Sequence, residues 1–190
     1  SWSSEAFALR VDTIAEVVRK SVPGGPDILL LQEIENGNAL AALRDRGLRG
    51  MGYIHAVLVP GRRLAATVAV LSRLPVARVH VWQVGPFRGD PVRDVLEVEI
   101  EAGGRVLHLL DNHWKSKIEG ARETEPSRLE SARVVSRRLR DILAADPRAD
   151  VVVAGDFNES IDEHTRAGGG YRTALVPLGE DVPSSSLAGT

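Results

Sequence analysis

Residues 150–158, DVVVAGDFN, join a short run of strand-forming residues to a polar ending. Three valines followed by an alanine are typical of a strand buried inside a sheet. Asp156 and Asn158 are poor strand formers, and because they stand two residues apart, an extended backbone places both side chains on the same face. A strand that ends in a Gly-Asp turn would also explain the segment, so its meaning depends on the rest of the chain.

The composition is that of an ordinary globular protein. The chain has 190 residues, of which 43% are hydrophobic and 26% charged, which is enough for one domain with a core. The net charge of -2 gives no overall attraction to nucleic acid, so any site for a polyanion must be local. No apolar run approaches the roughly 20 residues that a membrane helix needs, so we expect no membrane insertion. The absence of cysteine excludes disulfides, thiolate metal sites and cysteine nucleophiles.

Helices and strands alternate along the sequence. Hydrophobic periodicity predicts helices at 5–20, 37–47 and 127–145. Runs or alternations of β-branched and aliphatic residues predict strands at 27–34, 53–59, 65–72, 77–84, 94–101, 105–114 and 150–158. The first and the last of these strands are continuous apolar runs, which is typical of burial on both faces. The pattern predicts an α/β or α+β sandwich, in which helices cover the outer faces of packed sheets.

Three of the predicted strands end in clustered polar side chains, which is unusual for buried strands. The clusters are Gln32 and Glu33, then Asp111, Asn112, His113, Lys115 and Lys117, and finally Asp156, Asn158 and Glu159. If the strand ends converge, they form a pocket that contains carboxylates, amides, an imidazole and two lysines. Carboxylates hold Mg²⁺ and accept a proton from an attacking water, while amides, lysine and histidine bind phosphate oxygens. The clusters therefore favour hydrolysis of a phosphoester.

Each of these groups also has a structural explanation. Glu33 could be a surface acid, Asp111 could cap the loop that follows it, and Trp114 is more typical of packing than of stacking. The arginines of the helix predicted at 127–145 are typical of a solvent-exposed face, and they are Arg133, Arg137, Arg138 and Arg140. The signatures of several other enzyme classes are absent from the sequence: the G-x-S-x-G elbow, the H-E-x-x-H zinc helix and the Walker loop.

Three segments, taken in order, resemble motifs of the endonuclease/exonuclease/phosphatase superfamily, which includes DNase I-like nucleases and sphingomyelinases. They are LQEIEN at 31–36, NHWKSK at 112–117 and GDFNES at 155–160, and VAVLSRLPV at 68–76 is similar to a further strand of the family. The likeness is greatest to bacterial proteins described as predicted nucleases. It implies a DNase I-like fold, which is a four-layer α/β/β/α sandwich with its site at one edge of the two sheets.

The resemblance assigns the metal and the water to the first and third motifs. Glu33 would be the metal ligand, with Mg²⁺ as the cofactor and Mn²⁺ as a substitute. Asp156 would orient or deprotonate the nucleophilic water, and Asn158 would bind the phosphate and position that water. The expected reaction is attack of water on a metal-bound phosphodiester.

The middle motif would contact the substrate. Asn112 and His113 would contact the scissile phosphate, with His113 stabilising charge or helping proton transfer. Lys115 and Lys117 are expected to contact the substrate backbone, on chemical grounds more than by family precedent. The expected substrate is a nucleic acid, DNA or RNA, and no protein partner is implied.

Two departures from the family pattern concern the ends of the chain. No strand that ends in Asn precedes Ser1, and the sequence contains no S-D-H motif. We therefore expect residues 1–190 to form a single domain of this type that is incomplete at both ends and lacks the first and last strands. The resemblance favours an exported bacterial protein, although no signal peptide is visible.

The motifs specify the chemistry more closely than the substrate. The favoured function is a metal-dependent nuclease, with endonucleolytic and exonucleolytic action both open. One alternative is a sphingomyelinase-like or small-molecule phosphodiesterase or phosphatase, and another is a degenerate, non-catalytic binding module. Inositol-phosphate phosphatases of the family are disfavoured, because Val153 stands where they carry Trp and the sequence has no Cys.

Overall fold

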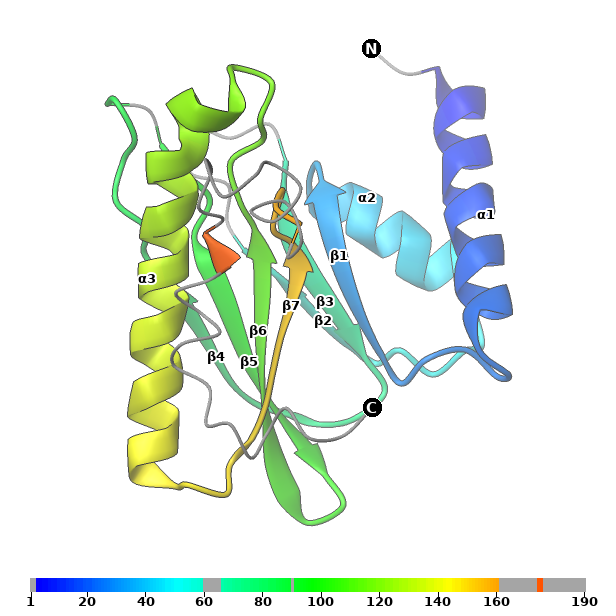
Figure 1. Ribbon diagram of the computed structural model, residues 1–190. Helices are drawn as coiled ribbons and strands as arrows, with labels where there is room; N and C mark the ends of the chain where they lie inside the picture. The colour runs from blue at the N-terminus through cyan, green and yellow to red at the C-terminus, as the bar shows by residue number, and fades with distance from the viewer. Residues whose placement is uncertain (1–2, 60–65, 90, 161–173, 176–190) are drawn as a thin grey trace.

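The computed structural model describes residues 3–59, 66–89, 91–160 and 174–175. Four layers lie side by side in Figure 1: the pair α1 and α2, a three-stranded sheet, a four-stranded sheet, and α3. The helices are α1 (Ser4–Ser21), α2 (Gly37–Ala41), its π-helical extension η1 (Ala42–Gly47), and α3 (Ala121–Ala145). The strands are β1 (Ile28–Ile34), β2 (His55–Leu58), β3 (Thr67–Ser72), β4 (Val76–Trp82), β5 (Val95–Ala102), β6 (Arg105–His113) and β7 (Asp150–Asp156). The predicted α/β/β/α sandwich is confirmed.

The smaller sheet has the strand order β1-β3-β2, and both pairings are antiparallel. Its outer face is covered by α1, α2 and η1, because side chains such as Ala15, Leu40 and Leu43 pack against Leu71 of β3. This is the helical layer that the periodicity at 5–20 and 37–47 predicts. Its apolar cluster holds β1, and with it the first polar cluster, in a fixed place.

The larger sheet has the strand order β4-β5-β6-β7. β4, β5 and β6 are antiparallel neighbours, whereas β6 and β7 are parallel because α3 carries the chain back between them. The parallel register places His113 opposite Asp156. The second and third polar clusters are therefore neighbours at one edge of this sheet.

Two further apolar clusters join the layers. Between the sheets, Val68 and Val70 pack against Leu96 and Val98. Between the larger sheet and α3, Leu110 packs with α3 side chains that include Val135. Burial of apolar surface on both sides of each sheet is the main force that holds such a sandwich together. None of the described helices has the length and apolar character needed to cross a bilayer.

Burial of β1 and β7 is lower than predicted. Both strands were expected to be buried on both faces, but β1 is mostly half-buried and Val152 of β7 is 42% exposed. The reason is that each strand is the outermost described strand of its sheet. The apolar sequence therefore predicted the strands correctly but not their place in the sheets.

The third helix begins six residues earlier than predicted, at Ala121 instead of residue 127. Pro126 lies inside the helix, although proline lacks the N–H that an interior helical residue donates. The first turn is nevertheless held by Arg128, which donates to the carbonyl oxygen of Ala121 at 2.5 Å and to Oγ1 of Thr124 at 2.6 Å. A side chain of the same helix, seven residues along, thus supports a helix start that the apolar pattern did not indicate.

One arginine was wrongly assigned to the solvent-exposed face of α3. Arg138 reaches the larger sheet and donates to both carboxylate oxygens of Glu97, at 2.7 and 2.8 Å. Glu97 is fully buried, and it also accepts from Trp82 Nε1 and lies 3.0 Å from Nδ1 of His108. Burial favours the neutral form, but the hydrogen bonds from Arg138, His108 and Trp82 outweigh it and lower the pKa of Glu97.

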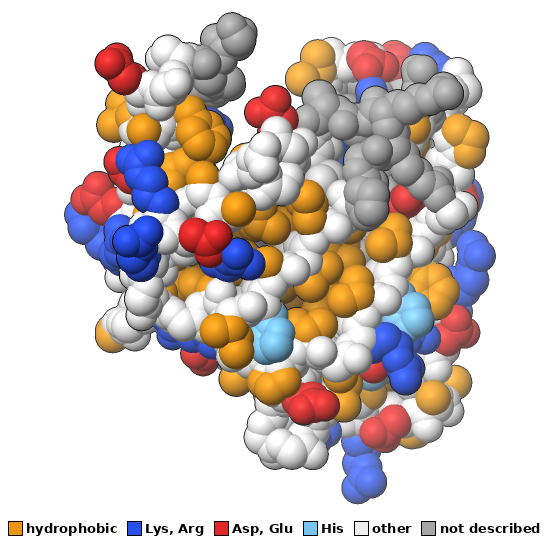
Figure 2. All heavy atoms as spheres, turned by 180° about the vertical axis from the view of Figure 1, so that it is seen from behind, with side chains coloured by type: hydrophobic (Ala, Val, Ile, Leu, Met, Phe, Trp, Pro, Cys, Tyr) orange, Lys and Arg blue, Asp and Glu red, His pale blue; other side chains and the backbone are white. Residues whose placement is uncertain are grey.

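The face opposite to that of Figure 1 is apolar in its centre. Figure 2 shows hydrophobic side chains gathered across the middle of that face, with charged side chains mainly around them. A polyanion is not expected to bind such a surface. The strands β1, β6 and β7 point toward the same end of the molecule (Figure 1). The three polar clusters predicted from sequence stand at or just after these strand ends, so this end is a more suitable place for a polyanion.

Candidate active site

The three polar clusters predicted from sequence meet at one edge of the sandwich. Nε2 of His113, at the end of β6, lies 3.3 Å from Oε1 of Glu33 and 3.9 Å from Oδ2 of Asp156. Glu33 belongs to β1 in the other sheet, so the site spans both sheets. The side chains of Glu33 and Asp156 are 63% and 52% exposed, whereas that of His113 is 5% exposed. Two accessible carboxylates therefore flank a buried imidazole.

The backbone at two of these positions adopts an unusual conformation. Glu33 has φ of 60° and interrupts the regular pairing of β1 with β3 between Leu31 and Ile34. Asn158 has φ of 49°. A left-handed conformation costs a residue with a side chain on the order of 1 kcal/mol or more, and such residues concentrate at functional sites. At Glu33 this conformation breaks the regular strand geometry, and at Asn158 it turns the chain shortly after the end of β7.

Gly155 allows β7 to approach β6 beside the site. Its φ is 130°, and a Cβ atom there would lie 2.0 Å from the carbonyl oxygen of Asn112. Only glycine has no side chain to cause this clash. The Gly-Asp dipeptide of the third motif thus has a structural reason: it brings Asp156 up to the end of β6.

The loops after β6 and β7 are tied to each other by hydrogen bonds. The backbone N–H of Trp114 donates to the Asp156 carbonyl oxygen at 2.8 Å. The Asn158 backbone N–H donates to Oδ1 of Asp156 at 2.9 Å, and its Nδ2 donates to the carbonyl oxygen of Trp114 at 3.1 Å. Trp114 itself is buried, and its ring meets the Phe157 ring edge-on with 4.9 Å between the ring centroids. The packing role expected for Trp114 is therefore confirmed.

Asn112 occupies a different environment from the one expected for a phosphate ligand. The side chain is fully buried, and Nδ2 donates to the carbonyl oxygens of Leu110 and Ala154 at 2.9 and 3.3 Å. Its Oδ1 accepts from Nε1 of Trp114 at 3.1 Å. These bonds link β6, β7 and the loop after β6. A phosphate contact by Asn112 stays a prediction, and this geometry favours a structural role.

The two lysines of the middle motif form ion pairs with glutamates other than Glu33. Nζ of Lys115 lies 2.5 Å from Oε1 of Glu119, and Nζ of Lys117 lies 3.4 Å from Oε2 of Glu159. Glu159 is also 2.5 Å from Nε of the buried Arg128, which donates to the Lys115 carbonyl oxygen at 3.2 Å. Contact of either lysine with a substrate backbone stays a prediction.

Arg93 is a site residue that the sequence did not reveal. Nη2 of Arg93 lies 3.2 Å from Oε1 of Glu33, and its Nε is 3.4 Å from the carbonyl oxygen of Ala66. The pKa of His113 is lowered, first by burial of its ring and second by Arg93, while Glu33 and Asp156 oppose the change. His113 is therefore neutral near pH 7.

The buried carboxyl group of Asp111 lies two residues before His113, on the same face of β6. Oδ1 of Asp111 accepts from Nε2 of Gln32 at 2.7 Å. Burial raises the pKa of Asp111 to about 7, although the bonds from Gln32 and the backbone of Asn112 oppose the rise. Asp111 Oδ2 and His113 Nδ1 are both buried, and neither has a hydrogen-bond partner among the described residues.

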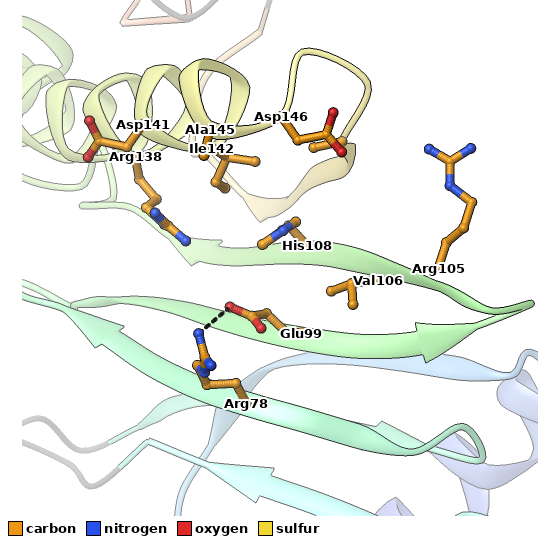
Figure 3. Close-up of a pocket in the computed structure, with 11 residues that line it drawn as sticks. Arg78, Glu99, Arg105, Val106, His108, Arg138, Asp141, Ile142, Ala145 and Asp146 are labelled. Carbon is orange, nitrogen blue, oxygen red and sulfur yellow. Dashed lines mark ion pairs between the residues drawn. The ribbon is translucent and has the colours of Figure 1, made fainter.

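A second group of potential metal ligands lies under α3. Ligand atoms of Glu97, Glu99 and His108 lie within 4.8 Å of one another. Figure 3 shows Glu99 and His108 beside a pocket of about 480 Å³ between α3 and the larger sheet. Arg138 already neutralises Glu97 with two hydrogen bonds, which disfavours a cation there. This group faces away from the smaller sheet, on which Glu33 lies.

The carboxylates at the strand ends fit a divalent cation better. Glu33 and Asp156 present hard oxygen ligands, and Mg²⁺ is usually bound by one or two carboxylates together with water and substrate phosphate. Both contacts described for the Glu33 carboxylate go to Oε1. The other oxygen, Oε2, is thus placed to accept a metal while Arg93 stays in contact with Oε1.

Comparison with known proteins identifies the family to which this chain belongs. The model of the Endonuclease/Exonuclease/phosphatase family matches residues 1–169, so the chain belongs to that family. Among curated proteins, the chain is 26% identical over 189 residues to 5'-tyrosyl-DNA phosphodiesterase of Caenorhabditis elegans, covering 95% of this chain. It spans 48% of that relative, which is about half of its length.

Two solved structures show the same fold. Truncated Caenorhabditis elegans TDP2 matches with a TM-score of 0.65 and 23% identity, over 90% of this chain and 61% of the other. A double mutant of beta toxin from Staphylococcus aureus, with bound magnesium ions, matches with a TM-score of 0.67 and 19% identity, over 90% and 63%. The DNase I-like fold implied by the motifs is therefore confirmed. The single domain incomplete at both ends stays a prediction.

Proposed function

We propose that this chain is the catalytic part of a divalent-metal-dependent phosphodiesterase that hydrolyses DNA. The observation that carries the proposal is the convergence of Glu33, His113 and Asp156 from three strands of two sheets. Membership of the family and the likeness to 5'-tyrosyl-DNA phosphodiesterase support phosphodiester chemistry and a DNA substrate. Nuclease action, the first expectation from the motifs, is the form of this activity that we favour.

Metal binding, proton transfer and phosphate binding fall to different residues of the site. Glu33 would hold Mg²⁺, which supplies charge stabilisation to the phosphoryl oxygens when bound. Asp156 takes a proton from the attacking water as the water oxygen bonds to phosphorus and the bond to the leaving oxygen breaks. Neutral His113 would turn its Nε2–H from Glu33 to a non-bridging phosphate oxygen when substrate binds, and Asn158 orients the phosphate beside Asp156.

A panel of three substrates tests the proposal. Supercoiled plasmid, a short DNA with a 5'-phosphotyrosyl end, and sphingomyelin vesicles are incubated with the protein in Mg²⁺ and, separately, in EDTA. We expect Mg²⁺-dependent hydrolysis of at least one DNA substrate. Cleavage of the plasmid supports a nuclease, whereas cleavage of the phosphotyrosyl end alone restricts the activity to DNA ends. Hydrolysis of sphingomyelin alone, or of nothing by the folded protein, contradicts a DNA phosphodiesterase.

A further inference from the structure

We propose that Arg93 binds a non-bridging oxygen of the substrate phosphate, an inference that rests on the proposed function. Arg93 stands two residues before β5, which runs antiparallel to β6. Because Leu96 lies opposite Asp111 in the register, the segment before β5 lies at the sheet edge where β6 ends. The fold thus brings Arg93 to the same edge as His113.

The contacts of Arg93 hold its guanidinium between the two sheets. Nη2 lies 3.2 Å from Oε1 of Glu33, and Nε lies 3.4 Å from the carbonyl oxygen of Ala66, the residue before β3. A guanidinium carries five N–H groups in a planar fork, so these two contacts leave further donors for an anion. The side chain is 23% exposed, so it is accessible yet held by the protein.

The negative charge of the site would repel a phosphodiester unless a cation offsets it. A phosphodiester that approaches Glu33 and Asp156 meets two carboxylates that are more than half exposed. Lys115 and Lys117 form ion pairs with Glu119 and Glu159. Arg93 forms an ion pair with Glu33 of the site, and an arginine fork matches the geometry of phosphate oxygens.

The same position gives Arg93 opposite effects on anions and cations. Its charge attracts a phosphate, but it repels a metal ion that binds to the Glu33 carboxylate. Removal of the charge should therefore weaken the binding of phosphate and leave the binding of Mg²⁺ equal or tighter. A residue that only maintained the shape of the site would weaken both when removed.

Calorimetric titration with inorganic phosphate and, separately, with MgCl₂ tests the proposal on the whole chain. The variants are Arg93→Gln and Arg93→Lys, with Arg137→Gln as a control on the exposed face of α3. We expect Arg93→Gln to weaken phosphate binding about tenfold or more, because a charge-assisted bond to phosphate is lost. The Lys variant should keep part of the affinity, and the control should match the unsubstituted protein.

Three results would overturn the proposal. They are an unchanged phosphate affinity in Arg93→Gln, a parallel loss of phosphate and Mg²⁺ affinity, and no phosphate binding by the unsubstituted chain. The titrations do not require turnover. A protein that binds phosphate through Arg93 but cleaves no DNA would contradict the proposed function and leave this inference standing.

Discussion

Asp111→Asn is expected to stabilise the protein at alkaline pH. The Asp111 carboxyl is fully buried, and its pKa is raised from 3.8 to about 7. Below pH 3.8 the group is protonated in both the folded and the unfolded chain, so it contributes no pH dependence. Between pH 3.8 and 7 the folded protein keeps a proton that the unfolded chain has lost. The free energy of unfolding therefore falls as pH rises through this range, and the loss is complete above pH 7.

The size of the effect follows from the two pKa values. Each pKa unit corresponds to about 1.4 kcal/mol, so the ionised Asp111 costs the folded protein up to about 4 kcal/mol above pH 7. Asparagine has the same shape, never ionises, and keeps an oxygen that can accept from Gln32. The stability advantage of Asp111→Asn over the unsubstituted protein should grow by about 3 kcal/mol between pH 5 and pH 8.

Urea unfolding at several pH values from 5 to 8 measures this advantage. Asp141→Asn, at an exposed position of α3, serves as the control and should change stability by no more than about 0.5 kcal/mol at each pH. An Asp111→Asn advantage that stays constant across the range would refute the reasoning, because it would mean that Asp111 titrates alike in the folded and unfolded chains.

Three other substitutions test the supports of the site. Arg128→Met should lower the free energy of unfolding by about 3–5 kcal/mol, since it removes the buried guanidinium that pairs with the fully buried Glu159 carboxylate; a loss below about 1 kcal/mol in urea unfolding would contradict this. Gly155→Ala should destabilise by about 3 kcal/mol or more through the clash with Asn112, and thermal unfolding at an unchanged temperature would show that β7 can shift instead. Glu33→Gln should raise the Mg²⁺ concentration needed for half-maximal activity, and an unchanged metal titration would place the ion on other ligands.

Local sequence patterns predicted the strands well and pointed to three polar side chains that the fold brings together. Alternation and apolar runs depend only on neighbouring residues, and polar clusters after such runs mark the ends of strands. Glu33, His113 and Asp156 were therefore found as candidates, and the two-sheet sandwich brings them together. Their chemical roles depend on bound metal and substrate, so they stay predictions.

Residues whose environment depends on distant partners were missed or misread. Arg93 belongs to no motif, and only the antiparallel pairing of β5 with β6 brings it to Glu33. Arg138 looked like a solvent-exposed helix residue, because its sequence neighbours do not show that Glu97 lies buried beneath it. A signal was present in the alternating glutamates of β5, which must find partners if a helix covers them.

Hydrolysis of supercoiled plasmid in Mg²⁺ by the unsubstituted chain and by Asp156→Asn, with Asp141→Asn as the matched control, tests the central claim most directly. Loss of a proton acceptor in the site should reduce the rate about 10²- to 10⁴-fold in Asp156→Asn while circular dichroism and urea unfolding stay near those of the unsubstituted chain. The control variant should keep full activity. Equal rates for Asp156→Asn and the unsubstituted chain would contradict the claim that the chemistry takes place where β1, β6 and β7 end.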